Sequence, residues 1–544
     1  MTVARDITKL PNLALDASRV TPVRSRMPLY LDLLPPCNNA CPAGENIQEY
    51  LRLVKAGEDE NAWREIVKNN PFPAIHGRVC YHPCEVACNR VELDGAVGIH
   101  SVERYLGDLA LEKGWEFEKP RYSSGQKVLV IGAGPSGMSA AYHLARMGHE
   151  VEIRDASELP GGMMRYGIPE YRLPRDVLDA EIERLKKLGI KFVQNYVCKD
   201  LLADQAEGGF GAAFVAVGAH LSKRVDIPTD DASKMMDAVT FLEKVAKGER
   251  PEIGEHVAIY GGGNTAMDAA RVARRLGAKD SIVIYRRTEE QMPAHEEEME
   301  GAVAEGVEMH WLRTIQSQEE HDVTVEIMEL DENGRPHGTG KYEKLAADTV
   351  ILALGQETDS NFLRKIPGMQ FEHDVLKVNP QTLMTSVPGI FAGGDAVPSE
   401  RTVTIGVGHG KKAAREIDAY LNHRESGQRP KHALASFNKL HLWYFGDVRQ
   451  TTQPELEPEK RIFDFDEINL GVGHDGALTE ACRCLSCGNC FECDGCLGSC
   501  PEDAVIKLGK GLRYRFDYDK CTGCAECYEQ CPVHAIEMIE EALV

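Results

Sequence analysis

The stretch KVLVIGAGPSG (residues 127–137) places a short apolar run directly before a glycine-rich turn. The run has the continuous hydrophobic character of a buried parallel strand, and an amphipathic stretch follows it. In such a strand–turn–helix unit Gly132 makes the tight turn, Gly134 lets a pyrophosphate approach the backbone, and Gly137 lets helix and strand pack closely. The unpaired amides at the start of the helix would bind the phosphates. We therefore expect a dinucleotide site that comprises Gly132, Gly134, Pro135, Ser136 and Gly137.

An acidic residue downstream strengthens this assignment. The next strand covers residues 151–154, and Asp155 stands at its end. A carboxylate at this position can accept hydrogen bonds from ribose hydroxyl groups. A glycine turn by itself matches many loops, whereas a strand, turn, helix and acid in register are typical of nucleotide-binding domains.

A second unit of the same kind begins with the strand HVAIY (residues 256–260). The turn GGGNTAMD follows at 261–268, in which alanine replaces the last glycine of the pattern. The next strand ends in Arg286 and Arg287, and guanidinium groups favour a 2′-phosphate, so we expect NADPH rather than NADH. The alternative is that both arginines are the solvated end of an edge strand. The expected binding residues are Gly261, Gly263, Asn264, Thr265, Ala266, Arg286 and Arg287.

Two cysteine runs near the C-terminus share the spacing C-x2-C-x2-C-x3-C-P, which is typical of paired [4Fe-4S] clusters. In this arrangement each run supplies three thiolates to its own cluster and the fourth to the other. Zinc is the alternative, but zinc sites need only two CxxC pairs and leave the third cysteine and the CP unexplained. One cluster is assigned to Cys490, Cys493, Cys496 and Cys531, and the other to Cys521, Cys524, Cys527 and Cys500.

The motifs between residues 35 and 420 together resemble those of one known family. They include GGMMRYGIP at 161–169, the GGGNTAMD turn, the strand that ends in Gly355, and GIFAGGD at 389–395. This combination is similar to the small subunit of bacterial glutamate synthase and its relatives, including the electron-input half of dihydropyrimidine dehydrogenase. The resemblance implies FAD in the first nucleotide site and NAD(P)H in the second. It also implies that Asp395 contacts the FAD ribityl chain and that Thr404 lines the flavin. Further cofactor-binding positions in this interpretation are Gly162, Arg165, Gly218, Gly355 and Gly394.

The expected fold class is α/β, with two nested Rossmann-like domains between two iron–sulfur domains. The predicted boundaries are 1–120 for a helical N-terminal iron–sulfur domain, 121–244 with 346–429 for the FAD domain, 245–345 for the inserted NAD(P)H domain, 430–480 for a connector, and 481–544 for a ferredoxin-like α+β domain.

Five further cysteines precede the first nucleotide site, at 37, 41, 80, 84 and 88. By resemblance to the family, Cys41, Cys80 and Cys84 hold one cluster, and Glu103 occupies the position of a fourth ligand. Relatives carry an additional CLxC pair just before Cys37, and residues 30–36 contain none.

The missing pair has a counterpart near the C-terminus, where RCLSCG covers residues 483–488. Our hypothesis is that the chain folds back so that Cys37, Cys88, Cys484 and Cys487 hold a fourth cluster. The alternative is a total of three clusters, in which Cys37 or Cys88 completes a single N-terminal site.

Composition narrows the functional classes. The net charge of −23 over 544 residues disfavours nucleic acid and anionic membranes as partners. The sequence has no secretory leader pattern and no run of 18 apolar residues, which predicts a cytoplasmic protein without a membrane span. Seventeen cysteines in that compartment indicate metal ligation rather than disulfides.

The predicted function is an FAD-dependent iron–sulfur NAD(P)H oxidoreductase that exchanges electrons with a partner redox protein. Candidate partners are a ferredoxin or a dissimilatory sulfite reductase, and a homodimer is a further expectation. The alternatives are a glutamate synthase small-subunit role with a separate large subunit, and a non-enzymatic zinc-bound or redox-sensing scaffold. A disulfide reductase of the thioredoxin-reductase type is disfavoured, because residues 132–410 contain only Cys198.

Overall fold

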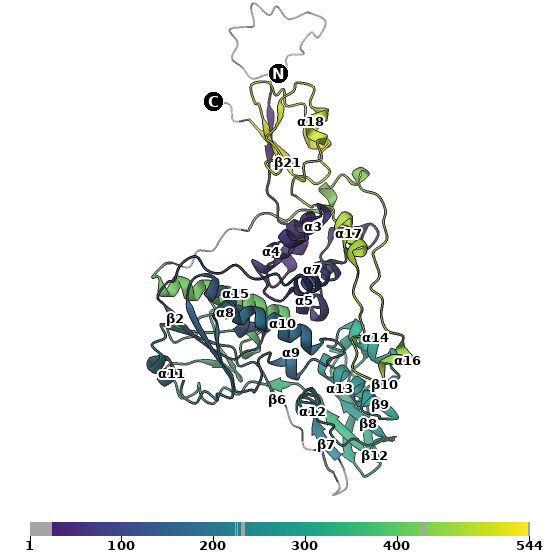
Figure 1. The fold of residues 1–544 in the computed structure, drawn as a ribbon. Coiled ribbons are helices and arrows are strands. Elements are labelled where there is room, and N and C mark those ends of the chain that lie inside the picture. Colours follow the sequence, from purple (N-terminus) through teal and green to yellow (C-terminus); the bar gives the residue numbers. More distant parts are fainter. Residues whose placement is uncertain (1–23, 223–224, 226, 230–233, 426–430, 542–544) are drawn as a thin grey trace, which may run out of the picture.

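The computed structural model describes residues 24–222, 225, 227–229, 234–425 and 431–541. Figure 1 shows two α/β domains at one end, a helical module in the middle, and a small domain at the other end. None of the helices in these ranges has the length and apolar character needed to cross a bilayer.

The first sheet is parallel and has the strand order β18-β5-β2-β3-β4. Its strands are β2 (Lys127–Ile131), β3 (Glu150–Arg154), β4 (Lys191–Val193), β5 (Ala212–Val215) and β18 (Ile390–Ala392). The main helices of this domain are α8 (Pro135–Arg146), α10 (Arg175–Lys186) and α15 (Val403–Leu421). Helices α8 and α15 pack closely, because a Cβ at Gly410 of α15 would come within 2.3 Å of the Ser136 carbonyl oxygen.

The second sheet is also parallel, with the order β10-β9-β8-β14-β7. Its strands are β7 (Lys234–Asp237), β8 (His256–Tyr260), β9 (Asp280–Tyr285), β10 (Val307–Trp311) and β14 (Thr349–Leu352). Helices α12 (Ala238–Ala246), α13 (Asn264–Arg275) and α14 (Glu296–Ala304) belong to this domain. An antiparallel sheet follows, made of β11 (Arg313–Gln318), β12 (Asp322–Leu330) and β13 (Pro336–Ala346).

The second domain lies between two strands of the first in sequence, since β5 precedes it and β18 follows it. Two short strands, β6 (Leu221–Ser222) and β15 (Gln356–Glu357), pair antiparallel where the chain passes between the domains. The second sheet draws on residues 234–352, a wider range than the predicted 245–345. The difference comes from β7 and β14, which pair in parallel at one edge of that sheet.

Six helices form the N-terminal module, and a seventh from far along the chain joins them. The six are α2 (Pro36–Ala40), α3 (Ile47–Lys55), α4 (Asp59–Val67), α5 (Pro73–Val79), α6 (Pro83–Val86) and α7 (Ile99–Lys113). Helix α17 (His474–Arg483) packs against α3 and α7. The end of the predicted connector 430–480, where α17 begins, therefore belongs to this module in the structure.

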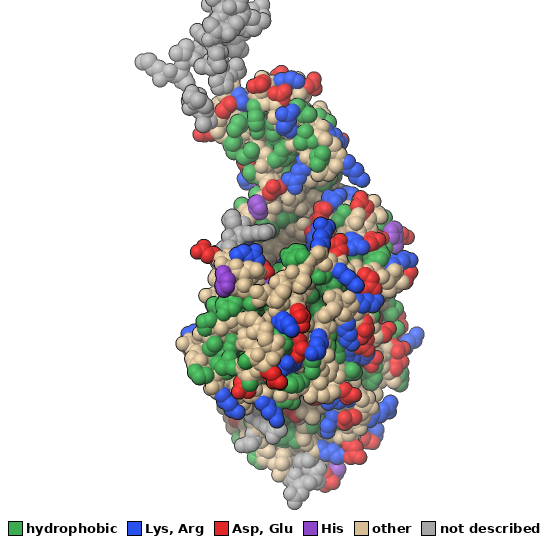
Figure 2. Space-filling view, turned by 60° about the vertical axis from the view of Figure 1, so that its left-hand side comes forward, with side chains coloured by type: hydrophobic (Ala, Val, Ile, Leu, Met, Phe, Trp, Pro, Cys, Tyr) green, Lys and Arg blue, Asp and Glu red, His purple; other side chains and the backbone are tan. Residues whose placement is uncertain are grey.

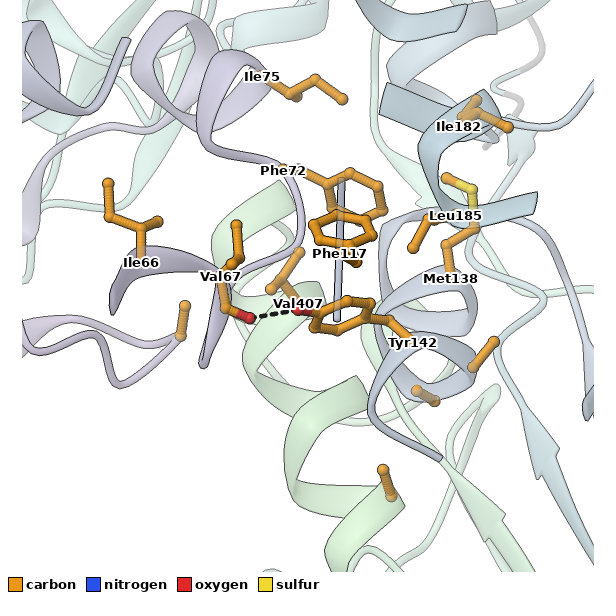
Figure 3. Close-up of a cluster of buried hydrophobic side chains, with 14 of the residues drawn as sticks. Ile66, Val67, Phe72, Ile75, Phe117, Met138, Tyr142, Ile182, Leu185 and Val407 are labelled. Atoms are coloured by element: carbon orange, nitrogen blue, oxygen red, sulfur yellow. Dashed lines mark hydrogen bonds between the residues drawn. The ribbon is translucent and has the colours of Figure 1, made fainter. Parts of the chain in front are cut away.

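The helical module and the first α/β domain share a hydrophobic core. Figure 3 shows Phe72 and Phe117 of the module close to Tyr142 of α8, whose hydroxyl donates to the Val67 carbonyl at 2.5 Å. Such burial of aromatic side chains supplies much of the packing energy between two domains. The core thus fixes the cysteines of the module relative to the first nucleotide site.

The C-terminal domain contains α18 (Gly495–Ser499), α19 (Glu526–Glu529), β19 (Val505–Lys507), β20 (Tyr514–Phe516) and β21 (Ile536–Glu540). Strand β1 (Arg26–Tyr30) pairs antiparallel with β21, so it lies with this domain rather than with the helices that follow it in sequence. The predicted N-terminal domain, residues 1–120, includes β1, whereas the structure pairs this strand with the C-terminal domain. Figure 2 shows the C-terminal domain as a narrow lobe with hydrophobic side chains on the face in view.

The remaining short elements are α9 (Met163–Tyr166), α11 (Leu201–Gly208), α16 (Pro458–Arg461), β16 (Phe371–Glu372), β17 (Val375–Leu376) and the 3-10 turns η1 (Asn89–Glu92), η2 (Glu289–Gln291), η3 (Gly394–Ala396), η4 (Phe437–Lys439) and η5 (Leu442–Tyr444).

Candidate functional site

The first glycine turn has the geometry of a phosphate-binding site. Gly132 has a φ of +109°, and a Cβ there would come within 2.3 Å of the Ala216 carbonyl oxygen. At Gly137 a Cβ would lie 1.9 Å from the Gly132 carbonyl oxygen, so helix α8 approaches the strand too closely for any larger residue. Gly134, by contrast, faces open space at the start of α8. A diphosphate fits against Gly134 and the first amides of this helix.

Asp155 is held beside this turn at the end of β3. One carboxylate oxygen accepts from the Ala133 amide at 2.6 Å and the other from the Ser157 amide at 2.7 Å. A carboxylate has about four acceptor positions, so both oxygens keep capacity for a ribose hydroxyl.

Three other segments close around the same turn. The Gly161 amide donates to the Ala133 carbonyl at 2.9 Å, and a Cβ at Gly162 would lie 2.8 Å from the Gly134 Cα atom. A Cβ at Gly394 would contact the Ser136 side chain at 3.0 Å. Next to it, burial raises the pKa of Asp395 to about 6. The first site is thus built from segments that are far apart in sequence.

The other predicted positions in this domain divide into two groups. Gly218 and Gly355 have φ values of +71° and +111° in the segments after β5 and β14. Arg165 instead binds its own loop, donating to the Pro160 carbonyl at 2.7 Å and pairing with Asp179. We interpret Arg165 as a residue that holds the 161–167 loop in place.

The second glycine turn repeats the first one. Gly261 has a φ of +150°, and a Cβ there would lie 2.2 Å from the Ala353 carbonyl oxygen, whereas Gly263 faces open space. The Asn264 side chain accepts from the His295 amide at 2.9 Å, which fixes the 294–295 loop beside the turn. Thr265 and the buried Ala266 lie in the first turn of α13.

Arg286 and Arg287 directly follow β9, at the edge of the sheet where the second turn lies. Arg286 is exposed and Arg287 is half-buried. Neither forms an ion pair with another residue of the described ranges, so both guanidinium groups are available to an anionic ligand.

A buried ion network that the sequence did not reveal connects the second site with the helical module. Arg172 pairs with Asp268 of the turn at 2.9 Å and with Glu298 of α14, and it donates to the Tyr81 hydroxyl at 3.2 Å. Burial raises the pKa of Asp268 to about 6. The Tyr81 ring also stacks on His295, with 3.5 Å between centroids. The sequence signal that could have pointed to Arg172 is the short stretch RLP at residues 172–174, just after the GGMMRYGIP motif.

The structure brings the C-terminal cysteines together in two adjacent groups. Burial raises the pKa of Cys496 to about 11, and the neighbouring Cys490, Cys531 and Cys493 contribute in the same direction. We call this group the first ferredoxin site.

The other group, which we call the terminal site, comprises Cys500, Cys521, Cys524 and Cys527, which line one small cavity. Burial raises the pKa of Cys527 to about 12, with contributions from Cys496 and from the other three cysteines of its group. The two sites are therefore neighbours, and Cys524 is exposed at the surface. The arrangement offers sulfur ligands in sets of four, the donor set that an iron–sulfur cluster needs.

The structure also brings together Cys37, Cys88, Cys484 and Cys487, which we call the middle site. Burial raises the pKa of Cys37 well above its usual value, and Cys484, Cys88 and Cys487 raise it further, in that order. Helix α17 ends at Arg483, and its packing on α3 carries the following Cys484 and Cys487 to the N-terminal module. Cys482 is exposed, and the buried Cys198 lies in the first α/β domain. This arrangement favours the fold-back hypothesis.

A fourth group, the inner site, consists of Cys41, Cys80, Cys84 and Glu103. Burial raises the pKa of Cys80 to about 12, and Glu103 contributes next in the same direction. Cys84 has Cys80, Cys41 and Cys37 among its neighbours, so the inner site adjoins the middle site.

Sequence reasoning missed the polar residues around the inner site. Asn70 is fully buried, and its amide nitrogen donates to Glu45 at 2.9 Å and to Glu103 at 2.8 Å. Burial raises the pKa of Glu45 to about 7, and burial with the adjacent Glu45 raises the pKa of Glu103 further. His76 lies 2.8 Å from the same Asn70 nitrogen. Buried polar residues follow no periodicity, so no local pattern in the sequence points to them.

Comparison with known families matches three parts of the chain. Residues 126–414 match the pyridine nucleotide-disulphide oxidoreductase family, which is more than half of the chain. Residues 33–115 match the 4Fe-4S cluster domain II of dihydropyrimidine dehydrogenase, and residues 514–537 match a 4Fe-4S binding domain.

Three relatives illustrate the similarity. The beta subunit of NADP(+)-dependent formate dehydrogenase from Moorella thermoacetica is 36% identical over 500 residues, which is 83% of this chain and 70% of that protein. The putative oxidoreductase YgfK of Escherichia coli is 31% identical over 94% of this chain, and the chain spans only 49% of its length. The glutamate synthase [NADPH] small chain of Azospirillum brasilense is 32% identical over 71% of this chain and 86% of its own.

Proposed function

The chain belongs to the glutamate synthase small-chain family of FAD- and NAD(P)H-dependent iron–sulfur oxidoreductases, and from this premise we propose that it transfers electrons between NADPH and a redox protein that binds its C-terminal domain. The enzyme uses FAD, NAD(P)H and [4Fe-4S] clusters. When bound, FAD exchanges a hydride with the nicotinamide, and the clusters carry electrons singly.

Each of the two glycine turns suits a different cofactor. The open space at Gly134 and the carboxylate of Asp155 suit the diphosphate and ribose of FAD. The open space at Gly263 and the free guanidinium groups of Arg286 and Arg287 suit NADPH. Thr404 of α15 and Cys84 of the inner site are both buried.

One observation carries the proposal. The four cysteine groups follow one another along the molecule: Cys80 of the inner site lies near Thr404 of α15, and Cys84 of the same site lies near Cys37 of the middle site. Cys487 and Cys490 are three residues apart in sequence, and Cys496 adjoins Cys527 of the terminal site. The series ends at exposed Cys524, where a partner protein can approach.

The partner is expected to present a neutral or basic face, because the chain carries a net charge of −23. A ferredoxin or a dissimilatory sulfite reductase fits this role, and the subunit names of the relatives support a stable partner subunit as well. Cytoplasmic location and a homodimer also remain predictions of ours, which fractionation and the mass in solution can test.

NADPH-dependent reduction of the anaerobically purified chain tests the proposal. We expect bound FAD, bleaching of both flavin and iron–sulfur absorbance on addition of NADPH, and electron transfer to an added ferredoxin. The double variant R286A/R287A should raise the KM for NADPH about tenfold or more while sparing NADH, because each charge-assisted hydrogen bond is worth roughly 1.5–3 kcal/mol.

Lys279→Ala is the matched control, since Lys279 is an exposed cation at the opposite end of β9 and pairs with Glu255. An enzyme without FAD, or iron that stays oxidised after both NADH and NADPH, would contradict the proposed function. Equal effects of the double variant on both nucleotides would contradict only the role of the arginines.

A further inference from the structure

The inner and middle sites adjoin each other but have different electrostatic surroundings. At the inner site the carboxyl groups of Glu45 and Glu103 are buried, with 3% and 6% of their surface exposed. Glu85 adjoins Cys84 as a third carboxylate. The carboxylate of Glu85, which lies 2.7 Å from a ring nitrogen of His100, places a negative charge beside Cys84, and such a charge disfavours the addition of an electron to a nearby cluster.

The middle site instead receives hydrogen-bond donors. The Asn89 side-chain nitrogen donates to the Cys487 sulfur at 3.4 Å, and the same nitrogen contacts the Ala435 carbonyl at 3.2 Å. The Ser486 amide points to the Cys484 sulfur at 3.5 Å. Hydrogen bonds to ligating sulfur withdraw charge from a cluster and raise its reduction potential.

A positive charge lies near the same site. Lys55 is the last residue of α3, is exposed, and lines a cavity of about 470 Å³ together with Cys484 and Phe491. Its ammonium group lies 6.0 Å from the centre of the Phe491 ring, which lines the same cavity as Cys484. Within the described ranges Lys55 forms no ion pair, so its charge is not neutralised by a carboxylate.

We propose that Asn89 and Lys55 give the middle site a higher reduction potential than the inner site. The inference rests on the proposed function and adds a direction to it, because electrons at the inner site would then favour the middle site. Asn89 and Lys55 act through the sulfur ligands and are positioning residues rather than catalytic ones.

Anaerobic redox titration of the full-length chain, followed by electron paramagnetic resonance, tests the proposal for the native protein and for N89L, K55M and R52M. We expect N89L and K55M each to lower the reduced fraction of the middle site up to tenfold at a fixed potential, which is about 59 mV for one electron. The inner-site signal should not change. Arg52 lies on the same helix, one turn before Lys55, and pairs with Glu49 at 2.8 Å, so R52M removes a neutralised charge and should shift neither signal.

Two outcomes would overturn the proposal. One is a middle site that titrates at or below the potential of the inner site in the native protein. The other is a K55M protein with full iron content whose middle-site potential equals that of R52M. Should N89L fail to load iron, K55M decides alone, because Lys55 is exposed and separate from the ligands. A chemical reductant sets the potential, so the result does not depend on whether NADPH is the physiological donor.

Discussion

At the scale of single residues, several ionisable side chains lie where the helical module meets the first α/β domain. His143 of α8 has 5% of its surface exposed, and one ring nitrogen lies 3.1 Å from the Asn69 carbonyl oxygen. Burial lowers its pKa to about 3, and the nearby Lys411 and Arg146 contribute in the same direction. Neutral His143 is therefore part of the packed interface, since its ring centre lies 5.0 Å from that of Tyr142, which Figure 3 labels.

This residue predicts a loss of stability in acid. Between pH 6.5 and 3 the unfolded chain binds a proton at His143 that the folded chain excludes, so the free energy of unfolding falls as the pH falls through this window. At pH 5 the loss amounts to about 2 kcal/mol. His143→Gln retains a donor for Asn69 but cannot ionise, so its urea midpoint should fall less between pH 7.5 and pH 5 than that of the native protein.

His321→Gln is the matched control, because the His321 side chain is 79% exposed. Equal losses in H143Q and in the native protein would show that His143 is not the group responsible.

The residue scale also shows what the sequence could predict about the site. Spacing alone predicts which cysteines form the two C-terminal groups, because each run carries its own complete pattern. Asn70 and Glu45 escaped prediction, since their role depends on burial beside Cys41 and Glu103, which no local pattern encodes. Arg172 escaped for the same reason, because its partners Asp268 and Glu298 come from another domain.

At the scale of elements, β1 forms a two-stranded sheet with β21 of the C-terminal domain. Its residues pair with β21 from Arg26 with Glu540 to Tyr30 with Ile536. The Tyr30 ring stacks on Phe516 with 4.8 Å between centroids, and its hydroxyl lies 3.6 Å from the Cys496 sulfur. An unpaired edge strand would leave amides and carbonyls open, so β1 both completes this sheet and shields the first ferredoxin site.

Tyr30→Ala should therefore weaken the C-terminal domain. The variant loses the stacking contact and uncovers the Cys496 sulfur, at a cost of about 1–3 kcal/mol. We expect faster bleaching of iron–sulfur absorbance in air and a lower urea midpoint for that signal. Leu29→Ala is the control, because Leu29 points to the opposite face of β1 and is 39% exposed. Equal bleaching rates in the two variants would rule out shielding by Tyr30.

Strength of local pattern explains which elements the sequence predicted. Two apolar runs before glycine turns, residues 127–131 and 256–260, form the parallel strands β2 and β8, respectively. Strand β1 has no comparable signal, because its partner β21 lies about five hundred residues away and supplies the pairing. Strand β7 also lacks a strong local signal, and it is defined by its pairing with β14.

At the scale of the whole molecule, the two ends of the chain meet twice. Strand β1 joins the C-terminal sheet, and helix α17 joins the N-terminal helices (Figure 1). The buried Arg483 at the end of α17 reinforces the second contact, donating to the Ala96 carbonyl at 2.5 Å and pairing with Asp94 at 3.1 Å. The pairing of β1 with β21 and the packing of α17 on the N-terminal helices thus both connect the C-terminal domain to the helical module.

The iron content follows from this closure of the chain. Four groups of ligands predict about sixteen iron atoms per chain, since each [4Fe-4S] cluster holds four. The double variant C484S/C487S should lose about four iron atoms and the matching acid-labile sulfide, because thiolates are the ligands that this cluster type requires. Cys482→Ser should keep the native content, since Cys482 lies in the same segment but is exposed and outside the middle site. A native protein with about twelve iron atoms, unchanged in the double variant, would mean that the fold-back of Cys484 and Cys487 builds no cluster.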